Sequence, residues 1–303
     1  MANTVQTDLV TAAQVYSDQF IEGISLALEP ISMFSTDFSA ALINSPGETV
    51  VFPLVMPDTA SEWNDTTNNY TRPVASLKDA SVTINKHPIT GFAIKPLQVA
   101  TFQPSYWQGR ARLNARSVGL SVVKEVFGLV TATNFPKSET VAAATFKKNV
   151  VAALRALAVN NNMAPGSTVV VLNPVYFALL LADLDASVYG GPEAIRNGHI
   201  PGLFGFRDIV EAPNYAGPGF LAYPSALAVA SRVLRPLRTE GYDVFETHQD
   251  DATGFAFNTV VSTELGTGRT SMAVDCNFGA AVGDKGETGR ETLIRLVEAT
   301  PPG

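Results

Sequence analysis

The sequence predicts an α+β fold that combines extended segments with a compact body. Three observations carry this prediction: two strand-like runs joined by a long polar tip, one helical stripe of about 25 residues after Pro104, and a series of short strands separated by turns after Tyr242. A chain of 303 residues is long enough for about two domains. The order of these elements is more informative than any single motif.

The N-terminal third of the chain predicts extended structure. Residues 1–45 are expected to form an arm, because short apolar clusters alternate there with polar gaps and no long helical stripe is evident. Residues 46–103 predict an extended loop with flanking strands, because runs at 49–55 and 80–84 bracket a polar, turn-rich stretch at 57–73. Such a two-stranded ribbon is only marginally stable in water unless it packs on another surface.

The sequence of residues 104–137 predicts a long helix followed by the start of a further structural unit. Apolar residues recur there at spacings of three and four, as expected for one helix face: Trp107, Ala111, Ala115, Val118, Val122, Val126 and Leu129. Gly119 and Gly128 each lower the helix propensity by up to about 1 kcal/mol. The helix must therefore be stabilised by packing against another element.

The remaining sequence predicts two further units. Residues 138–240 are expected to form a compact α/β unit, with a helix from about 138 to 159, a strand at 167–172 and a helix that Asn173 caps. Residues 241–303 are expected to form one antiparallel sheet, because turns with Gly or Asp separate four strand-like runs at 243–247, 255–262, 270–276 and 291–297.

The charge of the chain is low and unevenly distributed. Charged residues make up 16% of the sequence, against roughly 25% in a typical soluble domain, and large subunit interfaces are depleted in charge in the same way. Nine acidic residues and no Lys or Arg precede Arg72. This acidic stretch is expected to lie on a less acidic surface of the same or a neighbouring subunit, or to form an ordinary solvated face.

Residue types that support catalysis are sparse. The histidines, His87, His199 and His248, lie far apart in the sequence, and the single cysteine, Cys276, excludes an intrachain disulfide and a cysteine-based zinc site. Nucleophile-elbow, zinc-protease and Walker A motifs are absent. The net charge of −7 argues against a general nucleic-acid binder. We therefore expect no enzymatic activity and no catalytic, cofactor or metal site.

The order of arm, hairpin, long helix, α/β unit and antiparallel sheet resembles the major capsid proteins of tailed bacteriophages, which have the Hong Kong 97-like fold. The resemblance covers essentially the whole chain. Residues 48–95 resemble the family's extended loop, 104–130 its spine helix, 138–238 its axial domain, and the strands after Tyr242 its peripheral domain. The run at 198–214, GHIPGLFGFRDIVEAPN, is similar to an axial-domain passage of the family.

This resemblance implies a structural protein of the virion. Many copies would self-assemble in the host cytoplasm as pentamers and hexamers of an icosahedral shell around double-stranded DNA, with no membrane association and no sequence-specific DNA contact. Separate scaffolding, portal and decoration proteins are possible partners. An encapsulin-type nanocompartment shell is the alternative with the same fold. A small-molecule hydrolase or sugar-binding module, and a tail or decoration component, are alternatives of other classes.

Subunit contacts are expected where charge is concentrated. The acidic loop tip around residues 58–65 is expected to pack on a basic patch of a neighbour's long helix. The candidate interface residues are Asp58, Glu62, Trp63, Asp65, Arg72, Arg110, Arg112, Arg116, Arg196 and His199.

Overall fold

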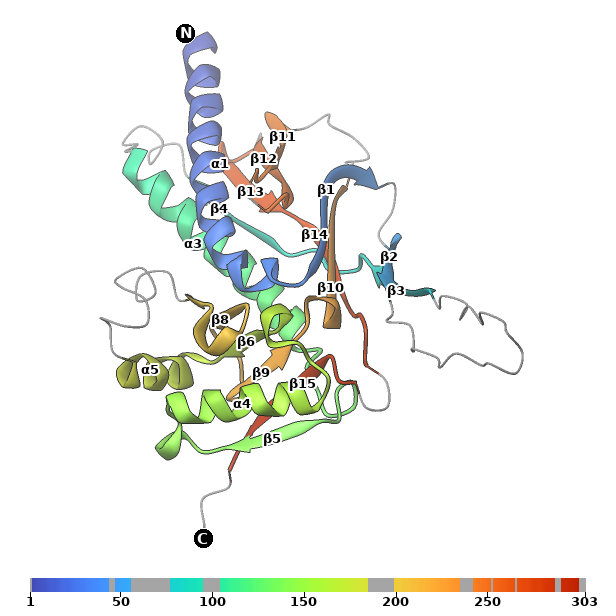
Figure 1. Cartoon of the computed structure of the whole chain (residues 1–303). Helices are drawn as coiled ribbons and strands as arrows, with labels where there is room; N and C mark the ends of the chain where they lie inside the picture. Colours follow the sequence, from blue (N-terminus) through green and yellow to red (C-terminus); the bar gives the residue numbers. More distant parts are fainter. Residues whose placement is uncertain are drawn as a thin grey trace, which may run out of the picture.

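The computed structural model describes residues 2–43, 47–55, 77–94, 104–184, 199–234, 242–251, 253–264, 266–286 and 290–299 (Figure 1). The helices in this part of the chain are α1 (Ala2–Ser32), α3 (Pro104–Phe127), α4 (Lys148–Asn160) and α5 (Pro174–Asp183). The strands are β1 (Ser35–Ile43), β2 (Thr49–Val55), β3 (Leu77–Thr83), β4 (Ile89–Ile94), β5 (Ser138–Val141), β6 (Val169–Leu172), β7 (His199–Pro201), β8 (Asp208–Glu211), β9 (Gly219–Ala222), β10 (Leu227–Leu234), β11 (Val244–Gln249), β12 (Ala256–Thr263), β13 (Thr270–Asp275), β14 (Asn277–Val282) and β15 (Leu293–Glu298).

The N-terminal segment contains a long helix, so the expectation that residues 1–45 lack a helical stripe is wrong. Helix α1 spans 31 residues. One side of it is fully buried at Ala13, Tyr16, Phe20, Ile24, Leu28 and Ile31, which recur every three or four residues. Apolar residues outside this stripe, such as Ile21 and Leu26, obscure the period in the sequence. The helix therefore belongs to the protein core.

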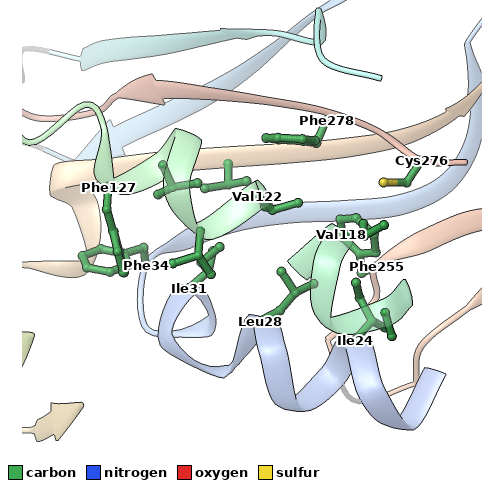
Figure 2. Close-up of a cluster of buried hydrophobic side chains, with 14 of the residues drawn as sticks. Ile24, Leu28, Ile31, Phe34, Val118, Val122, Phe127, Phe255, Cys276 and Phe278 are labelled. Atoms are coloured by element: carbon green, nitrogen blue, oxygen red, sulfur yellow. The ribbon is translucent and has the colours of Figure 1, made fainter. Parts of the chain in front are cut away.

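Helix α3 confirms the long helix that the sequence predicts, and its apolar stripe packs against α1. Figure 2 shows Ile24, Leu28 and Ile31 pointing toward Val118 and Val122. Phe34, which follows α1, packs edge-on against Phe127 at the end of α3, with 6.2 Å between ring centroids. Phe255, Cys276 and Phe278 close the same cluster from the strands. The two helices and the sheets thus share one continuous core.

Small residues let α1 and α3 approach closely where they pack. The helices run in the same direction (Figure 1), with Gly23 beside Ala115 and Gly119 beside Ala27. A Cβ atom added at Gly119 would lie 2.3 Å from the Ala27 Cβ, and one added at Gly23 would lie 2.8 Å from the Ala115 Cβ. These distances are too short for real carbon contacts, so close packing explains why α3 tolerates a glycine at position 119.

Replacing Gly119 by alanine is expected to lower the free energy of unfolding by about 1–3 kcal/mol, because the added methyl group forces the two helices apart. Gly109 lies on the same helix, and a Cβ atom added there meets nothing within 4 Å. Gly109→Ala is therefore the matched control, and it should stabilise the helix by up to about 1 kcal/mol. Denaturant unfolding of both variants measures the difference. Equal effects of the same sign would contradict the close approach.

The two strand-like runs predicted at 49–55 and 80–84 correspond to the paired strands β2 and β3. The strands pair antiparallel, from Thr49 opposite Thr83 to Val55 opposite Leu77. Val50 and Phe52 pack over a small cluster that consists of Val82, Ile84, Ala228 and Ala230. Beyond β3, the backbone of Lys86 exchanges two hydrogen bonds of 3.0 Å with Phe278 of β14. The root of the hairpin is therefore fixed to the body, while its tip at 56–76 lies outside the described residues.

A six-stranded sheet with the order β5-β15-β9-β6-β8-β7 forms the centre of the α/β unit. Alternate residues of its strands face opposite sides. Val170, Leu172 and Leu221 face the core that α4 and α5 cover, whereas Val169 and Phe220 face the core that contains α1 and α3. Because both faces are buried, this unit is packed rigidly onto the rest of the body.

The α/β unit confirms one expected helix start and corrects another. The amide of Tyr176 donates a 3.0 Å hydrogen bond to the Asn173 side chain, so Asn173 caps α5 as expected. The helix expected from residue 138 begins only at Lys148. Residues 138–141 form β5, which pairs parallel with β15. Three of these four residues are polar, which suits an exposed edge strand.

The expectation that the four strand-like runs after Tyr242 form one antiparallel sheet is wrong for the last run, which forms β15, and it does not include β14. Strands β11, β12 and β13 form such a sheet together with β4. Strand β14 instead pairs with β10, and β15 lies in the six-stranded sheet. Leu293 and Ile294 of β15 face opposite sides and are both buried, which is typical of a strand covered on both faces.

Candidate subunit interface

The structure describes the side chains of three candidate interface residues, all on α3: Arg110, Arg112 and Arg116. His199 begins β7, where it pairs with Val210, but its side chain lies outside the described part. The other candidates also lie outside it: Asp58, Glu62, Trp63, Asp65, Arg72 and Arg196. The contact between the acidic loop tip and α3 therefore stays a prediction.

Arg110 is held between two aromatic rings at the start of α3. Its guanidinium carbon lies 6.0 Å from the ring centroid of Phe92 and 5.5 Å from that of Tyr106. Its Nε donates a 3.2 Å hydrogen bond to the Tyr106 hydroxyl. Such cation–π contacts fix the side chain while its charge stays exposed. Tyrosine and arginine are also the residue types that contribute most to protein interfaces.

This aromatic cluster connects the surface to the core. Phe92 of β4 packs edge-on against Tyr106, with 6.4 Å between centroids, and tilted against Tyr16 of α1 at 5.8 Å. Burial raises the pKa of Tyr16 to about 12 even though Asn114 donates a 2.6 Å hydrogen bond to its hydroxyl. The phenol therefore stays neutral at physiological pH. Tyr106 itself is half exposed, so the cluster leaves one ring at the surface of the subunit.

Arg112 already has partners on the N-terminal helix of its own chain. Its Nη2 lies 3.4 Å from a carboxylate oxygen of Glu22, and its Nε donates a 3.1 Å hydrogen bond to Gln19. Both charged side chains are more than half exposed, so the pair contributes at most about 1 kcal/mol to stability. Arg112 is thus a contact within the subunit rather than a free basic group.

A second ion pair joins the N-terminal segment to the body. Arg232 of β10 donates to both carboxylate oxygens of Asp37 in β1, at 2.7 and 3.2 Å, and to the Asp37 carbonyl at 2.8 Å. This bidentate geometry is stronger than a single contact between point charges. This ion pair and the one formed by Glu22 show that two of the acidic residues before Arg72 contact basic side chains of the same chain. That outcome is one of the alternatives that the charge distribution left open.

A groove of about 550 Å³ lies between helices α1 and α3 and the end of β8, which contributes Val210 and Glu211. Arg112 and Arg116 line it from α3, and Glu22, Leu26 and Glu29 line it from α1. Leu26 is 70% exposed. This mixture of apolar and charged groups suits a protein contact and offers no set of catalytic side chains.

The titratable groups of the described chain show no catalytic arrangement. No three His, Cys, Asp or Glu side chains in that part gather as metal ligands. Complete burial raises the pKa of Cys276 well above its usual range, so its thiol is inert. No helix within the described residues is long and apolar enough to cross a membrane.

Two features of this surface escaped sequence reasoning. The pairing of Arg112 with Glu22 requires α1 to be a helix parallel to α3, which the sequence did not indicate. The stacking of Arg110 on Tyr106 had a local signal, because residues four apart on a helix are neighbours. Its second ring, Phe92, comes from a strand and is brought there only by the tertiary fold.

Comparisons with known proteins identify the fold. No family model matches the sequence, and no curated protein matches it. Among solved structures, the capsid of cyanophage P-SCSP1u matches with a TM-score of 0.51 and 15% identity, over 88% of this chain and 87% of that chain. The mature capsid of bacteriophage PhiM1 matches with a TM-score of 0.51 and 10% identity, over 88% and 86%.

A virus-like particle from Pyrococcus furiosus also matches, with a TM-score of 0.50 and 13% identity, over 91% of this chain and 95% of that chain. At such low identities the likeness concerns the fold. The chain therefore has the Hong Kong 97-like fold of phage capsid proteins.

Proposed function

We propose that this chain is the major capsid protein of a tailed bacteriophage, and that it assembles as pentamers and hexamers of an icosahedral shell around the double-stranded DNA genome. The observation that carries the proposal is the fold, which matches phage capsid structures over more than four fifths of both chains. The protein is then structural and not an enzyme. Scaffolding, portal and decoration proteins would be separate partners.

The hairpin of β2 and β3 supports assembly, because one of its faces stays exposed within the described part of the chain. Val50 and Phe52 pack on the body, but Val51 on the opposite face is 55% exposed. A two-stranded ribbon gains little stability by itself. A neighbouring subunit would cover this face in a shell.

Charge complementarity supports a second contact. Arg110 and Arg116 are exposed on α3, whereas Arg112 already contacts Glu22 and Gln19 of its own subunit. The acidic stretch at 58–65 is a suitable counterpart from another copy, because opposite charges steer and register an interface. Only Arg110 and Arg116 are thus proposed as the basic side of that contact.

The acidic net charge supports a shell that encloses DNA without binding it tightly. A surface that neutralised many phosphates would bind DNA strongly at low salt and release it slowly. The chain carries a net charge of −7, although arginines cluster at 110–116 and again at 232–238. The proposed wall therefore holds DNA without sequence-specific contacts, inside a virion that assembles in the host cytoplasm.

A nanocompartment of the encapsulin type is the second candidate. The match to the virus-like particle from Pyrococcus furiosus favours it, because that match covers 91% of this chain. The nucleic acid inside purified, nuclease-treated particles separates the two candidates. Protected double-stranded DNA of uniform, genome-sized length supports the phage shell, whereas particles that hold a protein and no DNA support the compartment. Failure to form particles alongside proteins from neighbouring genes would contradict both.

A further inference from the structure

We propose that His248 is a proton-controlled contact between helix α1 and the hairpin of β11 and β12, and that acidification loosens the docking of α1. This inference rests on contacts within one subunit and does not depend on the proposed function. It concerns a half-buried titratable group that the subunit contacts described above do not use.

The ring of His248 lies at the edge of the surface on which α1 docks. It stacks on Phe257 of β12, with 5.5 Å between centroids and 30° between the planes. Phe257 in turn contacts Phe20 of α1 at 4.7 Å. One turn earlier on α1, the hydroxyls of Ser17 and Thr259 form a buried hydrogen bond of 3.0 Å. The imidazole is therefore joined to the α1–β12 contact through one aromatic ring.

Charged groups face His248 from two of the elements packed against it. Asp18 approaches from α1 and Glu246 from β11, while β12 contributes Phe257 and Thr259, which carry no charge. The Nε2 atom of His248 is buried, and no hydrogen-bond partner accepts from it or donates to it within the described residues. Its distance to a carboxylate oxygen of Glu246 is 3.5 Å, longer than a good hydrogen bond.

Burial decides which protonation state the docked helix favours. It lowers the pKa of His248 below the usual 6.5, although the carboxylates of Glu246 and Asp18 act in the opposite direction. When α1 leaves the sheet, the imidazole regains water and its ordinary proton affinity. The undocked state therefore binds the proton more strongly. The contribution of His248 to docking is fully present above a pH of about 6.5. It is lost as the pH falls from there through the lower pKa that His248 has in the docked state.

The consequence is a helix whose attachment responds to mild acid. Because α1 covers the apolar stripe of α3, partial undocking exposes residues such as Val118 and Val122. Histidine is the side chain whose charge ordinarily changes in this pH range.

Peptide-resolved hydrogen exchange of the full chain tests the proposal, because it reports the opening of α1 in both assembled and unassembled protein. Between about pH 7.5 and about pH 5, opening of residues 13–31 should increase severalfold after correction for the intrinsic exchange rate. His248→Phe keeps the stacking on Phe257 and removes the titration, so this increase should disappear. His87→Gln is the matched control: His87 lies between β3 and β4, where it pairs with Asp275 of β13, and the increase should remain.

Further variants keep the test decisive if His248→Phe folds poorly. His248→Gln also removes the titration and should likewise abolish the increase. Asp18→Asn removes a carboxylate that favours protonated His248, so acid should open α1 further than in the unmodified chain. An acid-induced opening of the same size in both His248 variants, or its absence in the unmodified chain, would overturn the proposal.

Discussion

Replacing Phe20 by alanine is expected to lower the free energy of unfolding by about 3–5 kcal/mol, the usual cost of truncating a buried phenylalanine. Phe20 is fully buried and lies on the α1 stripe, where its ring contacts Phe257 at 4.7 Å. We expect the cavity left by the Phe20 ring to stay open, because α1 is held between α3 and the sheet of β11, β12 and β13 and cannot move to fill it. Denaturant unfolding of the unassembled subunit measures the effect.

Leu26→Ala is the matched control, because Leu26 lies on the same helix and is 70% exposed. Its effect should stay within about 0.5 kcal/mol, as for most surface substitutions. A Phe20→Ala variant as stable as Leu26→Ala would contradict the placement of α1 in the core. That result would favour an arm without a helix in the core, as the sequence pattern of residues 1–45 predicts.

Reversing the charge of Arg110 and Arg116 to glutamate is expected to abolish shell formation while the subunit stays folded. Both side chains are exposed on α3, so the subunit loses little more than the contacts of Arg110 with Tyr106 and Phe92, about 1 kcal/mol or less. Between copies, the reversal places like charges opposite the acidic stretch at 58–65, which is strongly unfavourable at an interface. Electron microscopy reports the particles, and circular dichroism reports the fold.

Arg110→Lys with Arg116→Lys is the control for this experiment, because it keeps both charges and the helix propensity. The lysine variant should still assemble, although with weaker stacking on Tyr106. Normal particles from the glutamate variant would contradict the proposed contact. An unfolded glutamate variant would contradict the view that these arginines serve the interface and not the fold.

Local patterns in the sequence predict the elements well where one signal dominates. The stripe of α3 is clean from Ala111 to Val126, so the helix could be predicted, and Asn173 next to a proline located the start of α5. Helix α1 was missed because Gly23, Leu26 and Pro30 interrupt an otherwise regular stripe. Its stability comes from tertiary packing, which local propensity does not express.

The pairing of strands that lie far apart in the chain could not be predicted from the sequence. The runs that became β11, β12 and β13 were recognised and do form one sheet, but β15 joins β9 and β5 instead. Alternation of polar and apolar residues defines a face, not a partner. Only the burial of both Leu293 and Ile294 indicates that β15 lies between two layers.

The candidate interface also combines features with a local sequence signal and features that arise only from tertiary packing. Clustered arginines on the predicted long helix were a local feature, and the structure places Arg110, Arg112 and Arg116 on an exposed face of α3. The partners of Arg110 and Arg112 could not be predicted, because Phe92 and Glu22 reach them through the packing of β4 and α1. Close approach at Gly23 and Gly119 is what brings Glu22 within reach of Arg112.

Negative-stain electron microscopy of the purified chain, expressed together with the proteins of its neighbouring genes, tests the central claim most directly. The account predicts closed shells built from pentamers and hexamers. A chain that stays a monomer near 32.2 kDa in the presence of those proteins would contradict it.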